Sequence, residues 1–582
     1  MNLLSGNFFE NKTKVYLTLV LVPLCLYFKS LFYDFSPLDD QWMVLKNAGE
    51  LGNWHNLPVF FAKPVAQVYY RPLLNVSLMI DYQFGGLSPF IYHYTNLLLH
   101  LLCVVLLFNF LKLVNTSNKF AFTLALLFSV HPVLLHAVAW IPGRNDLLLS
   151  LFMLCSTNSL LNYLRDQKTK HLASHILFFM CALFTKENAF FLLLFFALLG
   201  FSLRYSKKQL ALLTVAWLLS TISWFLIRQS VVNSHLTAGA HLSDTLKNAA
   251  LAFLLFTGKT LLPVQQSVFP TLKNASLVPG IVVLVSLAIL YFKFRLKNNL
   301  LAFSGLLLFV SILAIPVWYS AGKEISEHYE HRLYLPLIGL LLFISQFNVN
   351  VNTKLFNYSS LCIILLFGGK TVVRMDVYKN EMTFLGHGIA ETPDYFLFHF
   401  QKANKLFALK DCNGAIASYN TAIRLQPRRS ELYNNRGNVY AFIKKYKQAI
   451  ADYSKAIELL PNDPQAYINR CIISGEAGDY ETAQRDLLFL KQNYPGLIPQ
   501  ELNDNITSTW NDRWLEQLNR KLVNEPKNAT LYVKRAKLFL SKQLMNKAFE
   551  DIKTACELDP ANTEYKMYLA RLSPVQVSAL AN

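Results

Sequence analysis

Two adjacent aspartates, Asp39 and Asp40, follow the first long apolar segment of the chain, at the end of the string FSPLDD. Neighbouring carboxylates repel each other, and burial disfavours their charged forms, so the pKa of one of them can rise and that carboxylate can serve as a base. The pair is therefore a candidate general base. The alternative is a solvated loop end or a helix start, because Ser36 and Asp39 are residue types that cap helices.

Charged and polar groups that could form a binding site for a phosphorylated substrate occur further along the chain. They are Arg71 in YYRPL, Arg144 and Asp146 in GRND, Lys186 with Glu187, and Glu330, His331, Arg332 and Tyr334 in EHRLYLP. Arginine keeps its charge and binds phosphate through two parallel hydrogen bonds, so the sequence predicts phosphate binding at Arg332. The alternatives are an interfacial anchor of Tyr329, Arg332 and Tyr334 and an incidental surface ion pair of Lys186 with Glu187.

Histidines and an asparagine stand near the ends of two apolar segments. His93, Asn96 and His100 share one helical face, where polar groups either line a cavity or bond neighbouring helices. His131 and His136 are five residues apart with a proline between them, which argues against a shared metal-binding face. The eight cysteines form no CxxC pair, so no metal is assigned, although a divalent ion remains open.

The elements that must position these residues are membrane helices. The chain of 582 residues is 53% hydrophobic and only 16% charged, against about 25% charged in soluble domains. A spanning helix needs about 20 apolar residues. Eleven segments qualify: 14–33, 92–113, 119–138, 146–164, 171–185, 188–203, 208–227, 277–293, 299–318, 333–348 and 355–373. A twelfth, 247–262, contains Lys259 and is expected to be re-entrant or interfacial.

Charge predicts the orientation of these spans. With the N-terminus in the cytoplasm, every second loop is rich in Lys and Arg, whereas the other loops hold nearly all the acids. An odd number of crossings then places the C-terminal part outside the cytoplasm. Because so much of the net charge of +19 lies in short loops, it indicates membrane topology, and we expect no nucleic-acid partner.

The C-terminal part is a repeat array. Prolines recur every 34 residues at 427, 461 and 495, and again at 526 and 560, which is the period of the tetratricopeptide repeat (TPR). Small residues and aromatics fall at the offsets that paired helices need, for example Gly437, Tyr440, Ala449 and Tyr453. The sequence thus predicts an all-α chain: a polytopic membrane bundle over 1–392 and a TPR α-solenoid over 393–582. Such arrays bind proteins or peptides.

In their order and rough spacing, these stretches resemble the GT-C membrane glycosyltransferases, most closely the transmembrane-and-TPR-containing protein O-mannosyltransferases and their bacterial relatives. The resemblance extends from about residue 14 to the end. It rests on LDD at 38–40, YRP at 70–72, Tyr92, His93, Asn96 and His100, His131 with Pro132, Trp140, Gly143, Arg144 and Asp146, Lys186 with Glu187, and residues 330–336.

The resemblance implies transfer of a sugar, typically mannose, from a polyprenyl- or dolichyl-phosphate carrier to Ser or Thr of a protein, with inversion. Asp39 or Asp40 would be the base and Arg332 would hold the departing phosphate, with help from Arg71 and Arg144. Two departures concern the sugar and the phosphate contact: many family members have glutamate where this chain has His136, and His331 separates Glu330 from Arg332.

Other functions are compatible with the same sequence. The sugar could go to a lipid or glycan acceptor, or the chain could be a non-catalytic scaffold that assembles an envelope or secretion complex through its TPRs. The resemblance and the chain length predict a bacterial inner-membrane protein with periplasmic repeats. The alternative is an ER membrane protein with luminal repeats.

Overall fold

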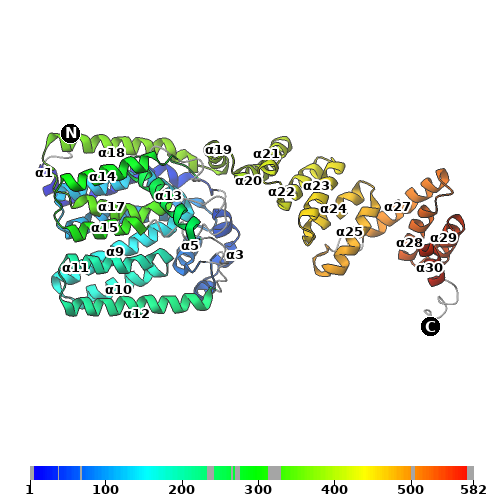
Figure 1. Ribbon diagram of the computed structural model, residues 1–582, viewed down its shortest axis with the longest axis horizontal. Helices are drawn as coiled ribbons and strands as arrows, with labels where there is room; N and C mark the ends of the chain where they lie inside the picture. Colours follow the sequence, from blue (N-terminus) through cyan, green and yellow to red (C-terminus); the bar gives the residue numbers. More distant parts are fainter. Residues whose placement is uncertain are drawn as a thin grey trace. The chain divides into compact units, whose positions relative to one another are not determined.

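The computed structural model describes residues 6–36, 39–65, 69–232, 242–263, 266–268, 276–311, 330–499 and 505–572. The chain divides into two compact units, residues 1–395 and 396–582, which we describe separately. Within the described residues both units are built from helices, and pairing of extended backbone is limited to two isolated bridges (Figure 1). The expected all-α class is thus confirmed.

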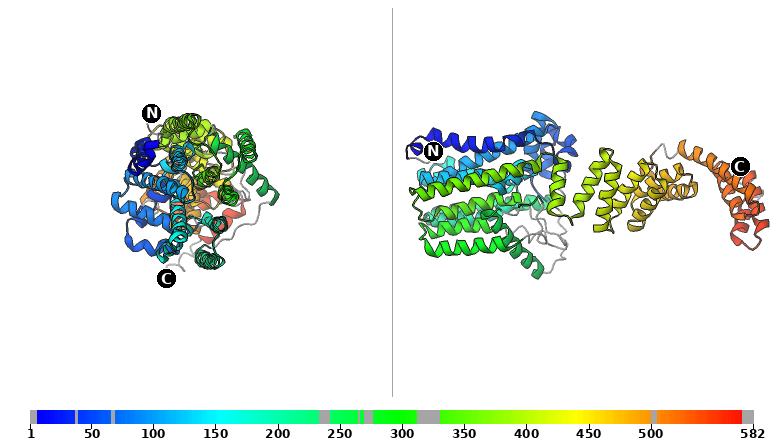
Figure 2. Two further views of the ribbon diagram at one scale, coloured as in Figure 1. Left: turned by 90° about the vertical axis from the view of Figure 1, so that its left-hand side faces the viewer. Right: turned by 90° about the horizontal axis from the view of Figure 1, so that it is seen from above.

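Most of the long helices of the first unit run roughly side by side, whereas α13 and α19 are inclined to them (Figures 1 and 2). They are α2 (Lys12–Tyr27), α5 (Pro72–Gly85), α6 (Pro89–Leu113), α7 (Asn118–Val130), α9 (Arg144–Asp166), α10 (Thr169–Leu183), α11 (Leu192–Ser202), α12 (Lys207–Val231), α13 (Leu242–Leu261), α14 (Val278–Lys293), α15 (Asn299–Val310), α17 (Tyr334–Ser345), α18 (Lys354–Met375) and α19 (Glu381–Glu391).

Short helical turns connect the long helices. They are α1 (Gly6–Glu10), η1 (Phe28–Phe32), η2 (Gln41–Leu45), α3 (Ala48–Leu51), η3 (Trp54–Asn56), α4 (Leu57–Ala62), η4 (Pro132–Leu134), α8 (Leu135–Ala139), η5 (Ile141–Gly143), η6 (Glu187–Phe191), η8 (Glu330–Leu333) and η9 (Asp376–Tyr378).

Four described helical segments are long and apolar enough to cross a membrane: Lys12–Phe32, Pro89–Leu113, Ile141–Asp166 and Lys207–Val231. Asn118–Val130 and Pro132–Ala139 would make a fifth span, bent by 47° at Pro132. Helices also occupy the other predicted segments, but several are shorter, so the number of eleven spans stays a prediction. Residues 312–318 of one such segment lie outside the described part.

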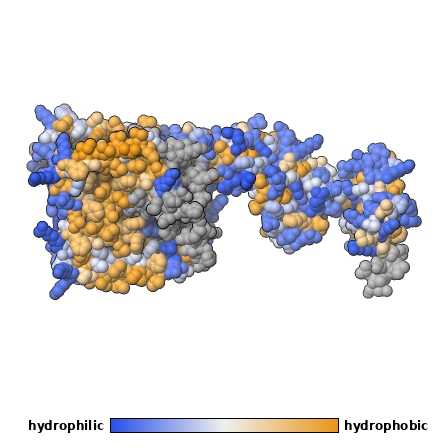
Figure 3. Space-filling view, viewed as in Figure 1, coloured by the Kyte–Doolittle hydropathy of each residue, from blue (hydrophilic) through white to orange (hydrophobic). Residues whose placement is uncertain are grey.

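The outer surface of this unit fits a lipid environment. Large apolar side chains are exposed along α12, α14 and α18, including Leu219, Val282 and Leu365, and one face of the unit is broadly hydrophobic (Figure 3). A water-soluble monomer rarely exposes such a large apolar area. Inside, Gly305 of α15 and Gly339 of α17 let the two backbones approach closely, because a Cβ on either glycine would meet the other's carbonyl oxygen.

The loops and short turns that connect the long helices fall into two groups, one at each end of the bundle, and hydrogen bonds join the loops of each group (Figure 1). The first group joins the basic loops, through Arg165 with Leu113, Gln209 with Gln167, Asn298 with Ser202, and Lys297 with Gln346. The second joins Asp34 with Lys379, Leu73 with Phe184, Arg71 with Glu187, and Lys186 with Asp146. The candidate catalytic groups therefore share the end opposite the basic loops.

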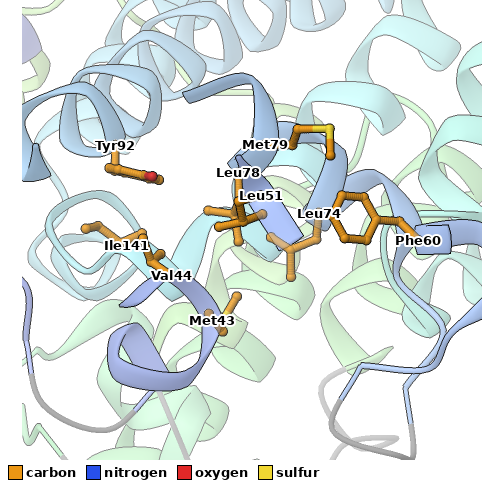
Figure 4. Close-up of a cluster of buried hydrophobic side chains, with 9 residues drawn as sticks. All are labelled: Met43, Val44, Leu51, Phe60, Leu74, Leu78, Met79, Tyr92 and Ile141. Carbon is orange, nitrogen blue, oxygen red and sulfur yellow. The ribbon is translucent and has the colours of Figure 1, made fainter. Parts of the chain in front are cut away.

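At that end, an apolar cluster holds the connection between α2 and α5 in place (Figure 4). Met43 and Val44 of η2, Leu51 of α3 and Phe60 of α4 pack with residues of α5 and α6. These side chains are all buried, so their packing restricts the movement of the α2–α5 connection. It thereby fixes the position of Asp39 and Asp40, which precede η2.

The second unit consists of paired helices. They are α20 (Phe396–Ala408), α21 (Cys412–Leu425), α22 (Ser430–Phe442), α23 (Tyr446–Leu459), α24 (Pro464–Glu476), α25 (Tyr480–Asn493), η10 (Pro495–Leu497), α27 (Asn505–Asn524), α28 (Ala529–Ser541), α29 (Met545–Leu558) and α30 (Thr563–Arg571).

The repeat offsets predicted from the sequence correspond to packing contacts in these pairs. Gly437 of α22 lies against the ring of Tyr453 of α23, where a Cβ would come within 2.7 Å of the ring. The part of the chain around Trp510 and Trp514 does not follow the paired arrangement. Its described residues form the single long helix α27, on which Trp510 packs against Gly475, while 500–504 lie outside the described part.

Candidate functional site

Asp39 and Asp40 are held in different ways. Asp40 is 1% exposed, and its Oδ2 accepts hydrogen bonds from the backbone N–H of Ser36 at 2.7 Å and from the Ser36 hydroxyl at 3.0 Å. Asp39 is half-buried, and its Oδ1 accepts from Trp42 Nε1 at 3.0 Å. Although Asp40 stands at the N-cap position of η2, it makes no capping bond. Asp40 thus organises the turn, and Asp39 is the more accessible carboxylate.

Burial raises the pKa of both aspartates. For Asp40 desolvation dominates over the hydrogen bonds from Ser36 and raises the pKa to about 8. For Asp39 desolvation also raises the pKa, while the Trp42 hydrogen bond and the charges of Arg332 and Arg71 oppose it. Asp39 is therefore a carboxylate with a raised affinity for a proton and two guanidinium groups near enough to act on it.

Arg71 lies next to this turn. Its Nε and Nη2 donate to Glu187 Oε2 at 3.1 and 3.0 Å, and Glu187 Oε1 accepts from the Tyr70 backbone N–H at 3.0 Å. Its guanidinium also stacks over the Tyr69 ring at 4.0 Å. Among the described residues, Nη1 of Arg71 has no recorded hydrogen-bond acceptor, so this edge of the guanidinium is available to a ligand.

Lys186 and Asp146 form a buried ion pair beside Arg71. Lys186 Nζ lies 2.8 and 2.7 Å from the two carboxylate oxygens, and the side chains are 7% and 3% exposed. Burial lowers the pKa of Lys186 to about 8, against the opposing effect of Asp146. His331 Nε2 is 3.7 Å from Asp146, and burial lowers the pKa of this histidine as well. The pair links α9 to the α10–η6 turn and to η8.

Arg332 belongs to the same group. It is half-buried in η8, and its charge lowers the pKa of Asp39, Lys186 and His331. Asp39, Arg71, Lys186 and Arg332 therefore lie within electrostatic range of one another, although they come from four separate connections of the chain. One candidate base and three cations gathered at one end of a helix bundle could bind a phosphate and take up a proton beside it.

Other predicted site residues lie deeper and bind protein groups. Arg144 is fully buried, with its Nη1 at 2.5 Å from Asp81 and hydrogen bonds to Asn96, Ser77 and the Tyr92 carbonyl. These contacts leave Arg144 no direct path to a substrate. Its geometry matches the interhelical bonding that the sequence left open as the alternative for Asn96.

The histidines of the apolar segments are likewise buried between helices. His100 lies 2.7 Å from the Tyr334 hydroxyl and 3.1 Å from the Ser129 carbonyl oxygen. His131 Nε2 lies 2.7 Å from the Thr260 carbonyl oxygen. His93 is buried with its ring against that of Tyr33. These histidines thus contact other parts of the helix bundle and stabilise the packing around the site.

His136 lies among site residues, with its ring centroid 5.0 Å from that of His331 and 4.8 Å from that of Trp140. His131 and His136, which are five residues apart in the sequence, thus contact different groups. In the described part of the chain, no group of three or more His, Cys, Asp or Glu side chains is arranged to hold a metal ion.

Three charged residues, Asp81, Lys259 and Arg374, were not among the site residues predicted from the sequence. Asp81 partners Arg144, and Lys259 of α13 is 2.6 Å from Glu330, whose Oε1 also accepts from the Ser267 backbone N–H at 2.9 Å. Arg374 of α18 pairs with Glu391 at 2.9 Å. A charge inside an apolar run is the signal that could have revealed Asp81 and Lys259, since such residues usually have a partner or a function. Their partners could not be read from spacing.

Known proteins are similar to the repeat part of the chain. Tetratricopeptide repeat models match residues 430–463 and 529–562, and a TPR repeat model matches residues 403–441. The predicted repeats are thus confirmed over these residues.

Relatives with longer alignments carry one common description. Protein O-mannosyl-transferase TMTC2 of Homo sapiens is 39% identical over 101 residues, which are 17% of this chain and 12% of the human protein. Protein O-mannosyl-transferase TMTC1 of Mus musculus is 36% identical over 126 residues, which are 20% of this chain and 13% of the mouse protein.

Protein O-mannosyl-transferase F38B6.6 of Caenorhabditis elegans is 23% identical over 381 residues, which are 62% of this chain and 54% of the worm protein. That share of the chain is longer than the whole of residues 396–582, so the similarity includes part of the first unit. All three alignments span only about half or less of the relative's own length. The chain contains tetratricopeptide repeats and resembles protein O-mannosyl-transferases.

Proposed function

We propose that this chain is a membrane glycosyltransferase that moves a sugar, with mannose the first candidate, from a polyprenyl-phosphate carrier to Ser or Thr of proteins outside the cytoplasm. The observation that carries the proposal is the position of Asp39. It is a half-buried carboxylate on which the charges of Arg71 and Arg332 act, at the end of the bundle opposite the basic loops. The names of the relatives support the class of reaction.

In the proposed reaction, a Ser or Thr hydroxyl oxygen of the acceptor forms a bond to the anomeric carbon of the donor. The bond between that carbon and the phosphate oxygen breaks, and the polyprenyl phosphate leaves with the electron pair. The hydroxyl proton passes to Asp39. Because the acceptor attacks from the side opposite the phosphate, the anomeric configuration is inverted.

The cations have separate tasks in this reaction. Arg71, through its unused Nη1 edge, and Arg332 bind the phosphate oxygens and stabilise the charge that grows as the carbon–oxygen bond breaks. The contacts of Asp146 with Lys186 and His331 hold η6 and η8 in position against α9. Asp40, bonded to Ser36, keeps the turn in the shape that directs Asp39 toward the donor.

The replacement Asp39→Asn tests the proposal. The assay uses the purified chain in detergent, a mannosyl-phosphoryl polyprenol and a Ser/Thr-rich peptide, with hexose on the peptide measured by mass spectrometry. Loss of a general base should lower transfer about 10²–10⁴-fold with unchanged yield of folded chain. Asp34→Asn is the matched control, because this aspartate is exposed in the same connection. Equal transfer by Asp39→Asn and wild type would disprove the assignment.

The same assay distinguishes the other functions. Hexose on an added lipid or glycan but not on the peptide would favour the alternative acceptor. If the folded wild-type chain transfers no sugar and its repeats capture another envelope protein, the scaffold function is favoured. The repeats fit either outcome, so the transfer measurement decides between them.

A further inference from the structure

A pocket lies in the repeat unit where the regular pairing of helices is interrupted. The single helix α27 follows α25, and residues of α25, α27 and the end of α28 line the pocket. Its volume is about 310 Å³, at the lower end of the range for small-molecule sites. Beside Trp510 and a few apolar side chains, the lining residues are Tyr480, Gln484, Lys491, Asn511 and Ser541.

The face of α25 that lines the pocket is polar, unlike the same face in the other repeats. Gln484 and Lys491 are seven residues apart and therefore share one helical face. Counted back from the repeat prolines, the positions equivalent to Gln484 hold Ile416, Ile450 and Phe549, and those equivalent to Lys491 hold Ile423, Ile457 and Cys556.

Apolar residues at these positions serve the packing of a repeat. Ile416, for example, packs against the buried cluster formed by α20, α21 and α22. The third repeat has Gln484 and Lys491 instead, at the point where no regular helix pair follows. This face of α25 is therefore suited to a polar ligand and not to a neighbouring repeat.

The pocket offers both hydrogen-bond donors and acceptors. Gln484 and Asn511 are half-buried, and among the described residues neither carboxamide has a recorded hydrogen-bond partner. The Ser541 hydroxyl donates to the Leu538 carbonyl oxygen at 2.8 Å, which leaves its own oxygen able to accept. Lys491 is exposed, and none of the described residues that line the pocket carries a carboxylate.

The aromatic side chains of the pocket are held in place. Trp510 packs against Gly475 of α24, where a Cβ would meet the indole ring. The two preceding repeats have Phe407 and Ala441 at the position of Gly475, so glycine there leaves room for Trp510. Trp510 also packs against the buried cluster of α24 and α25, and Tyr480 against that of α27 and α28. The walls are thus formed before a ligand binds.

A hexose ring matches this combination of groups. Its C–H face can stack on the indole, because the face of an aromatic ring is electron-rich. Each of its hydroxyls both donates and accepts, as the carboxamides of Gln484 and Asn511 do. An apolar peptide side chain would instead cover these carboxamides without bonding them, which costs free energy.

We propose that this pocket binds a neutral hexose of a glycan, with the ring stacked on Trp510 and its hydroxyls bonded to Gln484, Asn511 and Ser541. Lys491 donates to a further hydroxyl at the rim. The repeat unit thereby holds a protein that already carries sugar. Its use for acceptors or products of the transfer reaction rests on the proposed function, whereas the binding itself does not.

The test measures hexose binding by the full-length chain in a detergent without a sugar headgroup, since such a headgroup would compete. The probe is methyl α-D-mannopyranoside, followed by ligand-observed NMR. A ligand of about a dozen non-hydrogen atoms should bind with a Kd on the order of 1 mM. Gln484→Met/Asn511→Leu keeps the side-chain sizes but removes two bonding groups, and should raise Kd about 10-fold.

Gln492→Met is the matched control, because Gln492 is exposed on the same helix and does not line the pocket. This variant should bind as wild type does. A second probe, N-acetylphenylalanine amide, tests for a peptide side chain as occupant and should bind more weakly than the mannoside. Circular dichroism and thermal unfolding show that each variant is folded. Unchanged Kd in the folded double variant, or tighter binding of the phenylalanine probe, would overturn the proposal.

The outcome is independent of the transfer assay. If the mannoside binds and the double variant weakens it while the wild-type chain transfers no sugar, the pocket stands and the proposed enzyme activity fails. If the wild-type chain transfers sugar but does not bind the mannoside in the millimolar range, the enzyme stands and the hexose pocket is refuted.

Discussion

Ion pairs occur in both units of the chain, but they are organised differently. In the repeat unit one arrangement recurs: Arg436 with Asp452, Arg470 with Asp486, and Arg535 with Asp551 make the same two-bond contact. In the first unit each pair is unique. Lys186 with Asp146, Arg144 with Asp81, and Lys259 with Glu330 join different helices near one end of the bundle.

This difference indicates which ion pairs stabilise the fold and which ones position the candidate site. A pair that recurs at the same positions of several repeats serves the contact between the two helices of each of those repeats. A buried pair that occurs once is costly in its desolvation and gains little stability over an apolar pair of the same size. Such a pair is therefore better explained by what it positions, which for Lys186 and Asp146 is the surroundings of Asp39.

The largest effect is expected when one ion pair is broken in each unit. Lys186→Met leaves the Asp146 charge buried without its partner, which should destabilise the first unit by about 3–5 kcal/mol and lower its abundance. In Lys186→Met/Asp146→Leu the lone charge is gone, so abundance should recover, whereas sugar transfer should stay at least about 10-fold below wild type.

The matched pair is Arg470 with Asp486. In Arg470→Met/Asp486→Leu both abundance and transfer should recover, because the contacts of this pair, to α25 and to Ser454 of α23, all lie within the repeat unit. Abundance is measured by membrane immunoblot and transfer by mass spectrometry of the peptide. Full transfer by the Lys186→Met/Asp146→Leu variant would show that both pairs are architectural and would remove the distinction between the units.

A smaller effect compares the glycines that allow close packing. A Cβ at Gly339 would lie 2.5 Å from the backbone oxygen of Gly305, which cannot move without shifting α15. A Cβ at Gly437 would lie 2.7 Å from the edge of the Tyr453 ring, which can rotate slightly. Overpacking costs about 1–3 kcal/mol, so Gly339→Ala should reach the upper part of this range and Gly437→Ala the lower part.

Thermal unfolding of the purified chain, followed separately for the two units by limited proteolysis, measures this ordering. If Gly437→Ala destabilised its unit more than Gly339→Ala does, the backbone contact between α15 and α17 would be less restrictive than the structure indicates.

The last expected effect is the dependence of stability on pH that Asp40 contributes. Its pKa is about 8 in the folded chain against 3.8 for the unburied group, so between these values the folded state holds a proton that the unfolded state has lost. Stability therefore falls as pH rises through this window, with a slope of at most about 1.4 kcal/mol per pH unit. Asp40→Asn should flatten the slope, as unfolding at pH 5, 6, 7 and 8 would show. An unchanged slope would assign it to other groups.

The repeat unit was predictable from the sequence in much more detail than the site. A 34-residue period places Gly437 against Tyr453 with no further information, because neighbouring helices in a repeat array contact each other at fixed offsets. The residue types of the site were also visible, since charges in apolar surroundings are rarely incidental.

The pairings within the site were not predictable. Lys186 and Asp146 are 40 residues apart, and Lys259 and Glu330 are 71 apart, so no local pattern connects them. The sequence also could not distinguish Asp39 from Asp40. Their difference arises from the Ser36 hydrogen bonds and the cluster of η2, α3 and α4, which bury one carboxylate and leave the other accessible.

The central claim is that the turn with Asp39 and the repeat unit face the same compartment, away from the cytosol. A cysteine-free chain with a single new cysteine at Asn53, at Asn462 or at Lys354, all exposed, tests it with a membrane-impermeant maleimide on sealed cells or vesicles of known orientation. We predict that Asn53→Cys and Asn462→Cys are labelled from the extracytoplasmic side and Lys354→Cys only from the cytoplasmic side. Labelling of Asn462→Cys from the cytoplasmic side alone would contradict the account.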